Sequence, residues 1–306
     1  MGIVGLPNVG KSTLFNAITR AGAQAENYPF CTIEPNVGVV DVPDARLAVL
    51  HEMYQSKKTT PAAVRFVDIA GLVKGASKGE GLGNKFLEHI RQVDAIAHVV
   101  RCFEDADITH VEGAVDPIRD IGIITTELCL ADLETVEKRR EKLLRAMKSG
   151  SKEAKAEASL LERVASSLSE GRPARQLDFS EEEAALLREL TLLTMKPTLY
   201  VANVAEDEAA TAEKENPFVQ RVKEYAAAEG AEVVAISAKV EAEIAELSGE
   251  EAKEFLAAIG LAESGLDRLI KKAFSLLNLM TFLTAGPDEC RAWTITRGTT
   301  APKAAG

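Results

Sequence analysis

The sequence is poor in cysteine and has no long apolar run. Four cysteines are scattered over 306 residues and form no C-x-x-C pair. Their scarcity argues against a disulfide framework and a cysteine-only zinc site, and it suits a reducing cytosol. No apolar run approaches the roughly 20 residues that a helix needs to span a bilayer. We therefore expect a cytoplasmic protein that has no membrane partner.

Basic residues are fewer than acidic ones, 36 against 47, so the chain carries a formal net charge of −11 at pH 7. That balance argues against a protein that coats nucleic acid with its whole surface, and it leaves room for a local basic patch. The N-terminus enters an apolar run at once, so we expect no signal peptide. The length suits about two or three domains.

A phosphate-binding pattern stands near the start of the chain. Gly5-Leu6-Pro7-Asn8-Val9-Gly10-Lys11-Ser12-Thr13 matches G-x-x-x-x-G-K-[ST] in full. An apolar, strand-like run precedes it and a helical segment follows it. A helix N-terminus after such a loop directs backbone N–H groups and the helix dipole toward an anion. We predict that Lys11 neutralises the β- and γ-phosphates and that the Ser12 hydroxyl holds Mg²⁺.

Strand-like and helical segments alternate in two parts of the chain, which predicts a mainly parallel α/β sheet. The strand-like segments are 36–42, 63–67, 95–100, 197–203 and 232–237, and the helical ones are 12–21, 45–54, 84–92, 217–229, 241–247, 250–258 and 264–278. In the second helix, Leu47, Leu50 and Met53 share one side, which predicts a buried face.

The alternation stops at about residue 117. A long helical segment follows over 121–147, with apolar residues at 3-4 spacing and Arg140 at one core position. After a break at 149–151, a second segment repeats that spacing from Ala154 to Leu168. Two heptad-like helices joined by a short turn predict an antiparallel coiled-coil arm inserted into the sheet domain. Two ordinary amphipathic core helices are the alternative.

The predicted arm is basic at its turn. Residues 138–155 contain eight basic and two acidic side chains, a net charge of +6 within an acidic protein. Concentrated positive charge is an electrostatic footprint for a phosphate backbone. We predict that this part of the arm binds RNA or the ribosome, and a solvated helix face is the alternative.

A new unit begins near Met280, where Phe282, Trp293 and Ile295 lie in strand-like runs. About 27 residues are few for an independent fold. We therefore expect a small β-rich domain that is cut off at Gly306.

Three further stretches support a nucleotide-binding role for the phosphate-binding loop. Asp68 ends an apolar strand and forms D-x-x-G with Gly71, so that the carboxylate can hold a water on Mg²⁺ and the Gly71 N–H can meet the γ-phosphate. The Thr32 hydroxyl can complete the Mg²⁺ shell. Ser237 and Ala238, in Ser-Ala-Lys at a strand end, can approach the base. Each motif is weak alone, and their order in the chain predicts a nucleoside triphosphatase.

The base-reading stretch differs from that of a GTPase. Asn203-Val204-Ala205-Glu206 stands where Asn-Lys-x-Asp is expected. The longer Glu206 side chain spoils a bidentate fit to guanine, whose strength depends on geometry. Adenine asks for one acceptor and one donor, which the Asn203 side chain and the Val204 backbone N–H can supply. We predict that ATP is preferred over GTP, with a GTPase as the alternative.

Taken together, these motifs resemble those of the Obg-like ATPases, the YchF family of P-loop proteins. The resemblance rests on the phosphate loop, on 27–35 and on 68–73, and it extends over essentially the whole chain. It implies Mg²⁺ at Ser12 and Thr32, and a role with the ribosome or the translation machinery. It also implies a phosphate-binding segment made of Asn8, Val9, Gly10, Lys11, Ser12 and Thr13. The first strand looks shortened relative to the family.

The same resemblance implies a division into domains. Residues 1–117 and 180–278 form the nucleotide-binding G domain, and 118–179 form the helical arm. The segment 279–306 is similar to the start of the family's TGS domain.

The sequence lacks the glutamine that activates water in Ras-type enzymes. Leu72 stands where Ras-type enzymes have the glutamine that orients water. We therefore expect slow turnover, with Lys11 and Gly71 in catalytic positions and His110 as the histidine to test, by similarity to the family. A structural His110 is the alternative. A binding module that uses nucleotide only as a structural ligand also stays open.

Asn8 raises the question of a second cation. In related enzymes with Pro-Asn in this loop, the asparagine helps to hold a K⁺ ion near the phosphates. The alternative is a residue chosen for its turn conformation.

Overall fold

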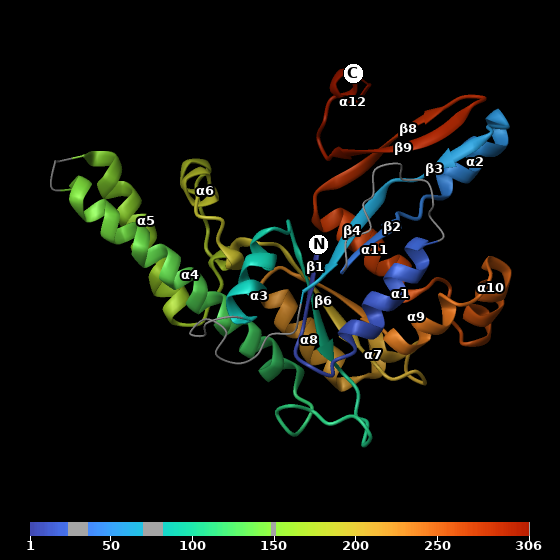
Figure 1. Ribbon diagram of the computed structural model, residues 1–306, viewed down its shortest axis with the longest axis horizontal. Coiled ribbons are helices and arrows are strands. Elements are labelled where there is room, and N and C mark those ends of the chain that lie inside the picture. The colour runs from blue at the N-terminus through green and yellow to red at the C-terminus, as the bar shows by residue number, and fades with distance from the viewer. Residues whose placement is uncertain (24–35, 70–81, 148–150, 306) are drawn as a thin grey trace.

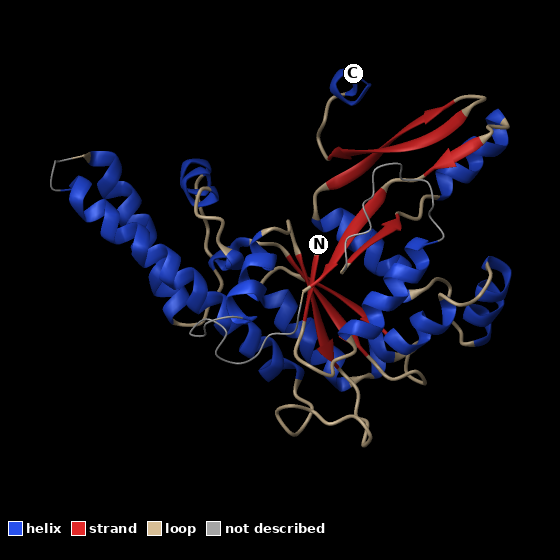
Figure 2. Ribbon diagram, viewed as in Figure 1, coloured by secondary structure: helices blue, strands red, loops and turns tan. Residues whose placement is uncertain are grey.

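The computed structural model describes residues 1–23, 36–69, 82–147 and 151–305, and it shows two sheets, flanking helices and a projecting helical arm (Figures 1 and 2). Its strands are β1 Gly2–Val4, β2 Val37–Asp41, β3 Lys58–Thr60, β4 Ala63–Asp68, β5 Ile96–Arg101, β6 Thr198–Asn203, β7 Glu232–Ile236, β8 Leu279–Ala285 and β9 Glu289–Thr296. Its α-helices are α1 Lys11–Ala23, α2 Ala45–Tyr54, α3 Leu82–Arg91, α4 Pro117–Met147, α5 Lys152–Ser169, α6 Glu181–Arg188, α7 Ala212–Glu215, α8 Pro217–Ala228, α9 Ala238–Ile244, α10 Gly249–Ala258, α11 Gly265–Leu276 and α12 Ala301–Ala305. Two 3₁₀ helices are η1 Ala174–Gln176 and η2 Leu193–Met195.

The larger sheet has the strand order β2-β4-β1-β5-β6-β7. Every neighbouring pair is parallel except β2 and β4, which run antiparallel. The predicted mainly parallel α/β fold is therefore confirmed. The exception is possible because β2 is an edge strand and needs to match only one neighbour.

Strand β6 shows why these segments are apolar throughout. Leu199 and Val201 join the cluster that includes α1 and α11, whereas Tyr200 and Ala202 face the cluster that includes α8. Successive side chains of a strand point to opposite faces. A strand covered by helices on both faces is therefore buried at every position, as β6 is.

Helix α2 corrects one prediction. Asp44 caps it by accepting a hydrogen bond from the Arg46 backbone N–H, so the helix begins where expected. Leu47 is buried, but Met53 is 70% exposed. The predicted apolar face is therefore buried only toward the start of the helix, where α2 packs against the second sheet.

The predicted arm is present as the paired helices α4 and α5, which extend away from the sheet (Figure 1). Val136 and Leu143 of α4 share a buried cluster with Leu161 and Val164 of α5, as the heptad spacing predicts. Arg140 occupies a core-register position but stays partly exposed, since its guanidinium pairs with Glu137 and Glu162.

Two buried carboxylates fasten the base of the arm to the sheet domain. Asp132 of α4 accepts hydrogen bonds from the backbone N–H groups of Leu193 and Thr194, at 2.9 and 2.7 Å, and from the Thr194 hydroxyl. Glu229 accepts two bonds from Arg175 of η1, which follows the arm, and one from Tyr200 of β6. Satisfied carboxylates of this kind fix one arrangement, because a half-paired charge inside a protein is costly.

The second sheet has the order β3-β9-β8. The hairpin β8–β9 was predicted, but β3 was not. Strand β3 pairs in parallel with β9, from Lys58 opposite Glu289 to Thr60 opposite Arg291. The C-terminal hairpin is therefore joined to a strand from the first part of the chain. Among the described helices, none has the length and apolar character of a membrane span.

Candidate phosphate-binding site

The loop between β1 and α1 has the backbone shape of an anion cradle. Asn8 and Gly10 both have positive φ angles, 63° and 91°. A Cβ atom at Gly10 would lie 2.1 Å from the Asn203 Nδ2 atom, so glycine is required there for space as well as for conformation. Helix α1 begins at the next residue, Lys11, and its first N–H groups have no intrahelical acceptor. The predicted loop is therefore formed, with a helix N-terminus behind it.

Lys11 and Asp68 meet at this loop. The Lys11 Nζ atom forms an ion pair with Asp68 Oδ1, and the two side chains are 10% and 19% exposed. The Asp68 backbone N–H also donates to the Asn36 carbonyl at 2.9 Å, which ties the end of β4 to the start of β2. The sequence placed these two residues in one site, and the structure brings them into contact.

The donor set at this position fits Mg²⁺. Ser12 offers an exposed hydroxyl in the first turn of α1, and Asp68 offers a carboxylate. Among the described residues, no group of three His, Cys, Asp or Glu side chains can hold a metal alone. Mg²⁺ is commonly bound by one or two protein oxygens together with phosphate oxygens and water. A site that relies on a bound nucleotide therefore suits this ion.

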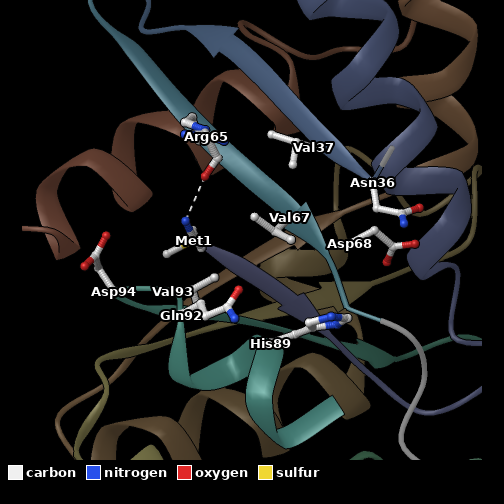
Figure 3. A pocket seen from close by; sticks show the side chains of 10 residues that line it. All are labelled: Met1, Asn36, Val37, Arg65, Val67, Asp68, His89, Gln92, Val93 and Asp94. Atoms are coloured by element: carbon white, nitrogen blue, oxygen red, sulfur yellow. Dashed lines mark hydrogen bonds between the residues drawn. The ribbon is translucent and has the colours of Figure 1, made fainter. Parts of the chain in front are cut away.

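Asp68 also lines an open cavity of about 380 Å³ (Figure 3). Asn36 and His89 lie with it at one end, while Met1 and Arg65 lie toward the other. The Met1 amino group donates to the Arg65 carbonyl at 2.7 Å, and burial lowers its pKa. The end of the cavity that holds Asn36 and His89 therefore adjoins Asp68, the candidate Mg²⁺ ligand.

Asn203, at the end of β6, braces two loops of the site. Its Nδ2 atom donates to the Val9 carbonyl at 2.8 Å, and its Oδ1 atom accepts from the Ala238 N–H at 2.9 Å. The residue is only 4% exposed. Asn203 therefore holds the phosphate loop against the start of α9, where Ser237 caps the helix.

The predicted contacts to adenine need correction. The Val204 backbone N–H donates to the Ile236 carbonyl at 2.9 Å, so it does not present a donor to a base. Both polar atoms of the Asn203 amide are also engaged inside the protein. Glu206 forms an ion pair with Lys239 of the Ser-Ala-Lys stretch. The sequence could not reveal these bonds, because each partner comes from the neighbouring strand or loop.

His110 lies in the loop that follows β5. Its Nε2 atom is 2.8 Å from Asp120 Oδ2, and its Nδ1 atom accepts from the Glu112 N–H at 3.1 Å. Both ring nitrogens are thus occupied, and the residue is 6% exposed. In this conformation His110 orders its own loop, and its catalytic role stays a prediction.

The same loop touches the phosphate loop, because Asn8 Nδ2 donates to the Thr109 carbonyl at 3.1 Å. A role of Asn8 in holding K⁺ stays a prediction. Thr32 and Gly71, as well as Leu72, lie outside the described residues.

Sequence reasoning missed Arg101 as a residue of this region. Arg101 ends β5 and is 1% exposed, and its guanidinium donates to three carbonyls of the loop that carries His110. The signal was present, since a single arginine closes the apolar run Ile96-Ala97-His98-Val99-Val100.

Two family models match the chain. A model described as "50S ribosome-binding GTPase" matches residues 1–161. A second model, named for the C-terminal part of YchF GTPases and described as a protein of unknown function, matches residues 279–306.

Curated relatives are similar over the whole chain. A protein from Bacillus subtilis named "Ribosome-binding ATPase YchF" is 59% identical over 305 residues, which are 100% of this chain and 83% of the relative. A protein of the same name from Escherichia coli O157:H7 is 56% identical with the same coverage. The solved structure described as the YchF GTPase of Schizosaccharomyces pombe superposes with a TM-score of 0.87 at 42% identity, covering 100% of this chain and 82% of that one.

Proposed function

Because the chain belongs to the YchF family, we propose that it is an ATP-hydrolysing P-loop protein that acts on the ribosome. The observation that carries the nucleotide part is the meeting of Lys11 and Asp68 beside a glycine-dependent loop and a helix N-terminus. The names of the bacterial relatives support the ATPase activity and the ribosome as partner.

The arrangement suggests how this chain's residues treat a triphosphate. Backbone N–H groups of residues 8–13 bind the phosphate oxygens, as helix N-termini do. When a triphosphate binds, Lys11 leaves Asp68 and pairs with the β- and γ-phosphates, which carry more negative charge. Ser12 and Asp68 are then the residues that hold Mg²⁺, whose charge neutralises the phosphates when it is bound. From their sequence motifs, we assign Thr32 to the Mg²⁺ shell and the Gly71 N–H to the γ-phosphate.

The proposed preference for ATP rests on Glu206, which stands where a GTPase has the aspartate that reads guanine. A guanine-specific site needs a carboxylate placed for a bidentate bond to the N1 and N2 donors of the base, and the longer Glu206 side chain displaces that group. In this structure Glu206 forms a surface ion pair with Lys239, whose side chain is 70% exposed. The Val204 N–H and the Asn203 amide make hydrogen bonds within the protein, so the contact that selects adenine comes from other groups.

A competition titration tests the proposal. We expect ATP to bind more tightly than GTP under identical Mg²⁺ and K⁺ concentrations. Lys11→Ala should lose tight triphosphate binding without losing the fold, because Lys11 contributes charge rather than core packing. Lys253→Ala, which removes an exposed lysine of α10 away from the phosphate loop, is the matched control for charge. Unchanged ATP affinity in Lys11→Ala contradicts the phosphate site, and a tenfold preference for GTP contradicts the choice of base.

A GTPase is the second candidate, because the matching family model and the S. pombe structure carry that name. A module that binds nucleotide without turnover is the third. Single-turnover hydrolysis of each nucleotide, with and without ribosomes, separates all three. Absence of turnover under both conditions favours the module.

A further inference from the structure

Residues 102–116, between β5 and α4, form a long connection with no regular element apart from one isolated bridge between His110 and Gly113. Connections longer than about 12–15 residues are uncommon within a compact domain, and most have a function or are disordered. This one has a defined path, because two arginines bind its backbone carbonyls.

Arg101 organises the first half of the connection. Its Nε donates to the Phe103 carbonyl at 3.0 Å, Nη1 to the Ile108 carbonyl at 2.9 Å and Nη2 to the Asp105 carbonyl at 3.3 Å. The guanidinium also lies 4.6 Å from the centre of the Phe103 ring. A buried cation is tolerated only when its donors are satisfied. The loop must therefore wrap around Arg101 in this way.

Arg119 organises the second half. Its Nη2 donates to the Ala114 carbonyl at 2.6 Å and its Nη1 to the Glu112 carbonyl at 3.3 Å. The same guanidinium pairs with Asp120, whose other oxygen meets His110. The connection is thus fixed from both of its ends.

The fixed connection reaches the phosphate loop at one point. The Thr109 carbonyl accepts a hydrogen bond from Asn8 Nδ2, and Thr109 directly follows Ile108, whose carbonyl Arg101 holds. Asn8 has a φ of 63°, in the left-handed region that asparagine tolerates better than most residues other than glycine. A hydrogen bond from its side chain helps to hold it there.

We propose that Arg101 is a positioning residue of the phosphate site: it sets the Thr109 carbonyl in place, and that carbonyl keeps Asn8 and the phosphate loop in their binding conformation. The functional part of this inference rests on the proposed nucleotide function. Its structural part does not, because the contacts lie within the protein.

Lysine cannot replace Arg101 in this role. Three carbonyls lie in a fork around one planar group, and a lysine ammonium is a single point that cannot reach all of them. Arg101→Lys therefore keeps the charge and loses the shape of the loop. Asn8→Gly keeps the positive φ and loses the side-chain donor.

Hydrogen exchange in the nucleotide-free protein tests the structural part. The Leu14 N–H donates to the Gly10 carbonyl at 3.0 Å, so its exchange reports on the end of the phosphate loop. This amide should exchange about tenfold faster in Arg101→Lys and in Asn8→Gly, which corresponds to one lost hydrogen bond. Arg163→Lys, which changes an arginine on the arm, should leave it unchanged. Unchanged exchange in Arg101→Lys overturns the inference, whatever nucleotide the protein binds.

Binding of Mg²⁺-ATP tests the functional part. Each single variant should bind about tenfold more weakly, and the double variant no more weakly than either, because both changes remove the same contact. A hundredfold loss in the double variant overturns the coupling. Should Arg101→Lys not fold, Arg119→Lys replaces it, with the same expected direction. Wild-type protein that binds neither ATP nor GTP contradicts the proposed function instead, and the exchange result still decides the structural part.

Discussion

Asn203 shows how much one short side chain can hold at the end of a strand. It joins the phosphate loop to the start of α9 through two hydrogen bonds, and it occupies the space that a side chain at Gly10 would need. The loop motif was predictable because glycine, lysine and serine have fixed roles at fixed spacing. The brace was not, because its partners are backbone atoms of residues far away in the chain.

His98 offers a test at the same scale. Its ring is buried in β5, 5.5 Å from the Tyr200 ring, and burial, with a smaller contribution from the Arg175 charge, lowers its pKa to about 3 from the ordinary 6.5. The unfolded chain takes up a proton below pH 6.5 that the folded protein does not. Stability should therefore fall by about 2 kcal/mol between pH 7 and pH 5 through this group.

Urea unfolding at the two pH values measures that loss. His98→Gln should remove this part of the pH dependence, because the replacement does not titrate. His51→Gln, at an exposed position, should retain it. Parallel stability curves for wild type and His98→Gln would contradict the prediction.

At the scale of the elements, the arm is less basic than its sequence window indicates. Lys138, Arg139 and Arg140 are each paired with a glutamate, and all of these glutamates lie outside residues 138–155. A count along the chain misses them, because helices bring together residues three or four apart and residues of the facing helix. Nearer the turn, Lys142 and Lys155 are exposed and form no ion pair with the residues that the structure describes.

Reversing those two charges tests the arm as the surface that meets the ribosome. Lys142→Glu combined with Lys155→Glu should weaken association about tenfold and flatten its salt dependence, because phosphate contacts release counterions. Lys214→Glu combined with Lys253→Glu changes the net charge equally on the sheet domain and should have little effect. Equal losses in both double variants would point to overall charge instead of the arm.

Most of the helices and the longer strands followed from the sequence pattern, whereas β3 and the helices α6, α7 and α12 did not. Three residues, Lys58–Thr60, carry too short a pattern to register as a strand, and their pairing partner lies in the C-terminal hairpin. Met53 was placed in a buried face for a related reason. Helical periodicity predicts which side chains lie on one side of a helix. The number of those side chains that are buried depends on how far the neighbouring sheet extends along the helix.

At the scale of the whole molecule, Asp44 links α2 to the C-terminal hairpin. Asp44 accepts bonds from the Arg46 side chain and from the Thr281 hydroxyl of β8, and Arg46 Nη2 donates to that hydroxyl at 2.6 Å. These bonds, with the Arg46 hydrogen bond foremost, lower the pKa of Asp44. Their stabilising effect is thus present above the ordinary carboxyl range and is lost as the pH falls below it.

Asp44→Ala should lower the free energy of unfolding by about 1–2 kcal/mol, since it removes both a helix cap and the link to β8. Asp44→Asn keeps the cap and should recover about half of that loss. Urea denaturation measures the loss of unfolding free energy, and hydrogen exchange of the β8 amides measures the loss of the link to that strand. A loss confined to α2, with β8 protected as in the wild type, would show that the junction does not depend on Asp44.

The pairing of β3 with β9 also dictates the order in which the chain can mature. Ribosomes make proteins from the N-terminus, so α2 and β3 emerge while β9 is still more than two hundred residues from synthesis. Until then Leu47 lacks its covering sheet, and β3 presents an open edge to other chains. Strands that are made late therefore cover part of the protein that is made early.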